Sequence, residues 1–172
     1  MKKLNSKILS GFTLVEVVIA CSIISIVLFA LLSVAEKGLK LSTLALKQAQ
    51  ASYILEEGAE AVKSIRDASW TNISSLSNGT TYYLYYNITN NVWTLNTSTT
   101  APSGYTPDTP IDDTFTRTIV FSPVYRNSST DDIASSGDLD VRTKKVTVTV
   151  SWPYFGATAS KDLSFYLIDI FN

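Results

Sequence analysis

Residues 11–35 of the chain read GFTLVEVVIACSIISIVLFALLSVA. This stretch is apolar almost throughout, and Glu16 is its only charged residue. From Val17 to Ala35 it supplies close to the ~20 apolar residues that a helix needs to cross the roughly 30 Å hydrocarbon core of a bilayer. We therefore expect a membrane-spanning helix near the N-terminus.

Glu16 needs a partner if it lies in a membrane. An ionised side chain near the centre of a bilayer costs roughly 3 kcal/mol on insertion scales, and more in simulations. A cut between Gly11 and Phe12 would create an α-amino group four residues before Glu16, on the same face of a helix. The carboxylate would then have a cation with which to pair.

The junction resembles the type IV pilin superfamily, whose precursors share a lysine-rich leader, a glycine at the cut and a glutamate as the fifth mature residue. The resemblance extends from residue 1 to about residue 66. It implies that Gly11 is the last leader residue and that Phe12 is the N-methylated mature terminus. It also implies that Glu16 registers one subunit against its neighbour during assembly.

The leader sets the expected orientation in the membrane. Lys2, Lys3 and Lys7 precede the apolar run, which places the N-terminus in the cytoplasm and everything after Ala35 outside. The resemblance implies four partners: prepilin peptidase, other pilin or pseudopilin subunits, an inner-membrane assembly platform and the lipid of the cytoplasmic membrane. After assembly the subunit would lie in an extracellular or periplasmic filament.

Two other processing signals overlap the apolar run. Val18-Ile19-Ala20-Cys21 resembles a lipobox, and Ser33-Val34-Ala35 is a small-x-small site of the kind that signal peptidase prefers. A secretory apolar region is about 7 to 15 residues long and free of acids, whereas Glu16 interrupts this run and the run continues well past Cys21. The alternative hypothesis is a single-pass or lipid-anchored surface binding module that does not polymerise.

Composition argues against several functional classes. The 172 residues are 45% hydrophobic with a net charge of -1, which is typical of neither a nucleic-acid binder nor a disordered tail. Cys21 is the single cysteine, so the chain forms no intramolecular disulfide. The absence of histidine and of a glycine-rich phosphate loop argues against an enzyme and against a cofactor. The adjacent Ser160-Lys161 pair is the remaining candidate for a nucleophile and its base. Its side chains would point to opposite faces of a strand, which argues against a catalytic role.

The helix is expected to continue beyond the membrane as far as Arg66, a length of about 80 Å at 1.5 Å per residue. An apolar stripe at a spacing of three and four residues supports this expectation, with Gln48 as its polar member. The stripe consists of Leu41, Leu44, Ala51, Leu55, Gly58, Val62 and Ile65. We expect it to pack mainly against the chain's own C-terminal sheet, and Gly38 and Gly58 to permit local bending.

Past Asp67 the composition changes to Ser, Thr, Asn and Tyr, and alternating or aromatic segments predict strands. These are Thr81 to Ile88, Val92 to Leu95, Phe115 to Phe121 with an end near Pro123, Val146 to Trp152, and Leu163 to Phe171. A turn over 153–160 would join the last two strands, and prolines at 102, 107 and 110 indicate an irregular loop. The predicted fold class is α+β, a long helix packed on a small antiparallel sheet of four or five strands.

The predicted domain organisation has three parts. A leader covers residues 1–11, a helix covers 12–66 with 12–35 as the membrane and filament-core segment, and a β-rich globular domain covers 67–172. The resemblance is nearest to minor pilins, type IV pilus modification proteins and the I-type minor pseudopilins of type II secretion. It rests there on Leu14 to Ala20 and on Leu55-Glu56-Glu57-Gly58 through Arg66-Asp67.

Two surface features have modest predictive value. Asp131, Asp132, Asp138 and Asp140 crowd one predicted loop, which makes them a weak calcium candidate beside the simpler interpretation of a solvated loop. Five Asn-x-Ser/Thr triplets also occur, as expected for a chain rich in these residues. They begin at Asn72, Asn78, Asn87, Asn96 and Asn127.

Overall fold

The computed structural model describes residues 11, 13–101, 103–107 and 109–170. It divides into two compact units, Met1–Leu46 and Lys47–Asn172. Phe12 and the lysines of the leader lie outside the described residues. The predicted α+β class is confirmed, because one long N-terminal helix is followed by an antiparallel sheet.

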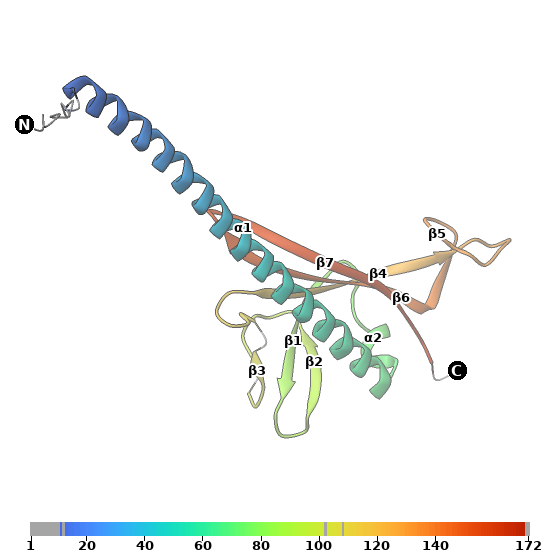
Figure 1. Ribbon diagram of the computed structural model, residues 1–172. Helices are drawn as coiled ribbons and strands as arrows, with labels where there is room; N and C mark the ends of the chain where they lie inside the picture. The colour runs from blue at the N-terminus through green and yellow to red at the C-terminus, as the bar shows by residue number, and fades with distance from the viewer. Residues whose placement is uncertain (1–10, 12, 102, 108, 171–172) are drawn as a thin grey trace, which may run out of the picture. The chain divides into compact units, whose positions relative to one another are not determined.

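Helix α1 runs without interruption from Leu14 to Ala68 (Figure 1). Among the described residues it is the one helix long and apolar enough to cross a membrane. In its apolar segment, the hydroxyls of Ser22, Ser25 and Ser33 donate to carbonyl oxygens four residues earlier at 2.8, 2.8 and 2.9 Å. Such bonds leave these hydroxyls with a partner in a lipid environment, where water supplies none.

The second unit contains an antiparallel sheet with strand order β2-β1-β4-β6-β7 (Figure 1). The helix of one turn that precedes it is α2 (Thr71–Ser74). The strands are β1 (Thr81–Asn87), β2 (Val92–Asn96), β3 (Thr106–Pro107), β4 (Thr116–Arg126), β5 (Ile133–Ala134), β6 (Asp138–Tyr154) and β7 (Ala157–Ile168). The two-residue strands β3 and β5 pair with β1 and β4. The five strands of the main path agree with the expected number.

The core lies between α1 and the sheet. Ala51, Leu55, Gly58, Val62 and Ile65 of the predicted stripe are buried, which confirms that this part of the stripe packs on the sheet. The sheet contributes the inward residues of its central strands, which are Ile119, Phe121, Val146, Val148 and Val150. Leu41 and Leu44 of the predicted stripe belong to the other compact unit.

Two strand boundaries differ from the prediction. Strand β4 does not end at Pro123 but continues to Arg126, and the pairing with β6 shifts register between Pro123 and Val124. A bulge tolerates proline because the ladder is already interrupted there. Strand β6 begins at Asp138, well before Val146, because its first residues pair with the end of β4 beyond the bulge.

The β6–β7 connection is also shorter than predicted. Tyr154 pairs with Ala157, so the turn consists of Phe155 and Gly156 alone. Their φ angles are 44° and 80°, as a two-residue type I′ hairpin turn requires. Phe155 therefore lies in the left-handed region that glycine and asparagine prefer.

Arg117 links the sheet to the helix from inside the core. Its side chain is fully buried on β4, on the same face as Phe115 and Ile119. The guanidinium donates to the carbonyl oxygen of Ile54 at 2.7 Å and to a carboxylate oxygen of Glu57 at 3.1 Å. Both acceptors lie on α1, so one side chain fixes the helix against the sheet.

Gly58 makes room for this arginine. A Cβ at position 58 would lie 2.8 Å from Cδ of Arg117 and 3.1 Å from Cγ1 of Val148. The Arg117 side chain is held at its end by two hydrogen bonds and has little freedom to move aside. The glycine is therefore required for close packing between α1 and the sheet.

Gly58→Ala is expected to lower the melting temperature of the full chain in detergent micelles. Alanine gains about 1 kcal/mol in helix propensity, but overpacking of a tight core typically costs about 1–3 kcal/mol. Gly38→Ala is the matched control, since a Cβ there meets nothing within 4 Å and the propensity gain stands alone. Thermal unfolding followed by circular dichroism measures both variants, and a Gly58→Ala chain as stable as Gly38→Ala would contradict the packing role.

Candidate processing and assembly site

The N-terminal end of α1 is built as a capping box. Thr13 precedes the first helical residue, Leu14, and its Oγ1 accepts a hydrogen bond from the backbone N–H of Glu16 at 3.3 Å. In return, Oε2 of Glu16 accepts from the backbone N–H of Thr13 at 3.1 Å and from its hydroxyl at 3.2 Å. These reciprocal bonds satisfy backbone N–H groups that have no hydrogen-bond partner at the start of an uncapped helix.

The capping box adds a role for Glu16 that the sequence interpretation missed. The carboxylate has hydrogen-bond partners within its own chain and lies in the first helical turn, where the helix dipole favours negative charge. The signal was readable as Thr13-Leu14-Val15-Glu16, the pattern T-x-x-E that precedes an apolar run. Thr13 therefore joins Gly11 and Glu16 as a residue of the site.

Of the two residues that flank the expected cut, Gly11 lies within the described residues and Phe12 does not. Gly11 is described and exposed, and a Cβ added to it would meet nothing within 4 Å. Phe12 lies outside the described residues. Helix α1 begins at Leu14, and Thr13 serves as its N-cap.

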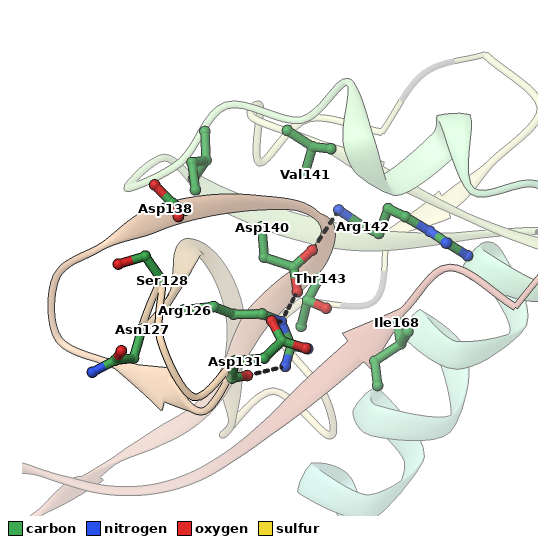
Figure 2. A pocket seen from close by; sticks show the side chains of 11 residues that line it. Arg126, Asn127, Ser128, Asp131, Asp138, Asp140, Val141, Arg142, Thr143 and Ile168 are labelled. Carbon is green, nitrogen blue, oxygen red and sulfur yellow. Dashed lines mark hydrogen bonds and ion pairs between the residues drawn. The ribbon is translucent and has the colours of Figure 1, made fainter.

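The four aspartates proposed as a weak calcium candidate do not lie on one loop. Asp138 and Asp140 belong to β6, whereas Asp131 and Asp132 belong to the loop before β5 (Figure 2). Among the residues that the structure describes, no group of three or more acidic, histidine or cysteine side chains is arranged to hold a metal ion.

Arg126 of β4 contacts two of these aspartates, Asp131 and Asp140. Its Nε donates to Oδ2 of Asp140 at 2.6 Å, and its Nη1 donates to the carbonyl oxygen of Asp131 at 2.9 Å (Figure 2). Burial alone would raise the pKa of Asp140, but the hydrogen bonds from Arg126 and from the Arg142 backbone N–H together lower it. This region therefore contains an ion pair that joins β4 to β6.

Asp140→Asn is expected to lower the melting temperature at neutral pH and to lose this effect in acid. Because the folded-state pKa of Asp140 lies below its ordinary value, its contribution is present above about pH 4 and is lost as the pH falls through the folded pKa. Melting curves of parent and variant at pH 7 and pH 3 test the sign. Asp138→Asn is the control, and a parent–variant difference that stays constant with pH would contradict the assignment.

The apolar anchor helix, its capped start and the C-terminal sheet define a membrane-anchored α+β protein. Comparison with known families adds the chemistry of its N-terminus: the prokaryotic N-terminal methylation motif matches residues 10–32. This motif is the type IV pilin signature, and the match is confined to the N-terminal segment of the chain. No curated protein and no solved structure matches the chain.

The match covers the part of the chain where the capping box lies. Gly11, Thr13 and Glu16 all fall within residues 10–32, as does most of the apolar segment of α1. The motif implies processing by prepilin peptidase and assembly with other pilins.

Proposed function

We propose that the chain is the precursor of a minor pilin or pseudopilin, cut between Gly11 and Phe12 and methylated at Phe12. The observation that supports this most directly is the methylation motif at residues 10–32, which coincides with the capped start of α1 and with an apolar segment, residues 11–35, whose one charge is Glu16. The N-terminus faces the cytoplasm and the β-rich unit lies outside the cytoplasmic membrane. The expected partners are prepilin peptidase, other subunits and an inner-membrane assembly platform.

The proposed function involves assembly and no chemical reaction of the mature chain. In the membrane, residues 17–35 contact lipid and the carboxylate of Glu16 is held by Thr13. On assembly, the same residues exchange lipid contacts for contacts with neighbouring helices. Glu16 then pairs with the Phe12 amine of an adjacent subunit, which compensates both charges and sets the axial register.

The assignment to a minor subunit rests on sequence resemblance in two segments, residues 14–20 and 55–67. The second of these contributes to the helix–sheet core through Leu55 and Gly58, while Glu57 binds Arg117. The domain depends on this core for stability, since the single cysteine rules out an intramolecular disulfide.

Intact mass and N-terminal sequencing of the chain from membranes of the producing cell test the proposal. The expected result is a chain that begins at N-methylated Phe12. A lipidated Cys21 or a start at Glu36 would overturn it in favour of the non-polymerising surface module. Crosslinking of the mature chain to other pilins tests assembly separately.

A further inference from the structure

We infer that residues 138–141 of β6 form a docking site for an extended segment of a partner protein in which basic and apolar side chains alternate. These four residues are called the open edge below. The segment adds to the sheet as a further strand, held by backbone hydrogen bonds. The site lies wholly within the compact unit Lys47–Asn172 and does not depend on the filament role proposed above.

The open edge has a neighbouring strand on one side only, within the part of the chain that the structure describes. On that side, residues 138–140 pair with the end of β4. On the other side β7 stops at Ile168, opposite Thr143, and the N–H of Asp169 then donates to the carbonyl oxygen of Arg142 at 2.9 Å. Because alternate residues of a strand direct their N–H and C=O groups to the same side, part of this backbone faces away from β4. An uncovered edge is a template for pairing with another chain.

The opposite edge of the same region is covered by the chain itself. Tyr125 and Arg126 of β4 pair with β6 on one side and with β5 on the other, so β4 is central here (Figure 1). Gly137 lets β6 begin close against β4, since a Cβ at this position would lie 2.1 Å from the carbonyl oxygen of Arg126. The open edge is therefore firmly supported from the β4 side.

Exposed apolar side chains and two hollows flank the open edge. Leu139 and Val141 are 56% and 71% exposed. Both line a hollow of about 610 Å³ that also contains Asp138 (Figure 2), and both line a second hollow of about 350 Å³ that is bordered by Leu76. Because successive side chains of a strand point to opposite sides, an added segment has side chains available for both hollows.

The charges of the larger hollow favour a basic side chain in the partner. Three aspartates and two arginines line it, which gives a net charge of -1: Asp131, Asp138, Asp140, Arg126 and Arg142. Arg126 is bound to Asp140 at 2.6 Å. The carboxylate of Asp138 is exposed and makes no hydrogen bond or ion pair with another described residue. A lysine or arginine opposite Asp138 on an added strand forms a cross-strand ion pair.

A second copy of the chain is a poor occupant of the open edge. In a symmetric antiparallel pair, a twofold axis at Leu139 places Asp138 opposite Asp140 of the second copy, and an axis at either aspartate places that residue opposite itself. Like charges directly opposite each other destabilise a sheet. An axis at Val141 requires pairing by Arg142, whose carbonyl oxygen already accepts a hydrogen bond within the chain. The occupant is therefore a basic segment of a different protein.

The test uses the full chain in neutral detergent micelles and the peptide acetyl-Lys-Val-Lys-Val-Lys-amide at about 1 mM, which detects even weak complexes. Hydrogen exchange of the backbone amides, followed by mass spectrometry, is expected to slow several-fold over residues 138–141. Exchange along β7 should not change, although β7 is also at an end of the strand order. Unchanged exchange at the open edge, or equal slowing along β7, would overturn the inference.

Two controls separate strand addition from simple attraction between charges. The peptide acetyl-Lys-Pro-Lys-Pro-Lys-amide keeps the positive charges, but its prolines lack N–H groups and disfavour pairing, so it should cause no slowing. Equal slowing by this peptide would overturn strand addition. In the chain, Asp138→Asn is expected to reduce the response to the valine peptide several-fold, whereas Asp162→Asn, at an exposed aspartate of β7, should leave it intact. A response that Asp138→Asn also leaves intact would overturn the choice of a basic partner.

Discussion

Gly11→Val is expected to leave the precursor uncut in the membrane, with no detectable chain that begins at Phe12. The chain itself does not require glycine here, because a Cβ at position 11 meets nothing within 4 Å and no left-handed backbone is present. A requirement for glycine would therefore come from an outside partner, namely a peptidase whose active site approaches the backbone closely. The variant thus separates recognition by the enzyme from folding of the substrate.

The measurement is the ratio of precursor to mature chain in membrane fractions, resolved by intact mass. Gly38→Val is a useful control, since Gly38 also has open space around it but lies far from the cut. Its leader should be removed as in the parent chain. If Gly11→Val is still processed before Phe12, prepilin peptidase is not the processing enzyme.

The elements with one buried face could be predicted from sequence. Strands β4 and β6 place Ile119 and Val148 inward and Thr118 and Thr149 on the other face, so a period of two shows in the sequence. Arg117 lies in this alternation with Phe115 and Ile119, but only the structure shows that its acceptors lie on α1. A long-range hydrogen bond leaves no periodic pattern in a sequence.

The start of β6 and the short strands β3 and β5 were not predicted from sequence, for a different reason. The first residues of β6, including Leu139 and Val141, are largely exposed, so no alternation marks them as a strand. They are held by pairing with the end of β4 beyond the bulge at Pro123, which depends on residues distant in sequence. Strands β3 and β5 have two residues each, too few for any period to appear.

The candidate site was predictable where it is local. Gly11 and Glu16 were assigned from the resemblance to the pilin cleavage site, and Thr13 could have been found from the capping pattern Thr13-Leu14-Val15-Glu16. The aspartates were not predictable in this way, because Arg126 reaches Asp140 from a different strand. Sequence proximity suggested one acidic loop, whereas strand pairing creates an ion pair.

Glu16→Gln is expected to allow processing but to lower assembly about a hundredfold or more. Glutamine retains the capping box, since the pattern T-x-x-Q caps a helix as T-x-x-E does, so the helix start should survive. The variant removes only the charge. A buried ammonium at Phe12 of a neighbouring subunit would then lack its carboxylate, and a buried pair broken on one side costs about 3–5 kcal/mol.

The quantity to measure is mature chain in sheared filaments, or crosslinked to partner pilins, divided by mature chain in the membrane. Thr13→Ser is the matched control, because a hydroxyl and a carboxylate both remain and the ratio should stay close to that of the parent. Thr13→Val separates the two roles further: it removes the hydroxyl cap but keeps the charge, so its loss should be smaller than that of Glu16→Gln. A ratio unchanged by Glu16→Gln would mean that the carboxylate serves this chain only as a helix cap, a role that the glutamine side chain fills equally well.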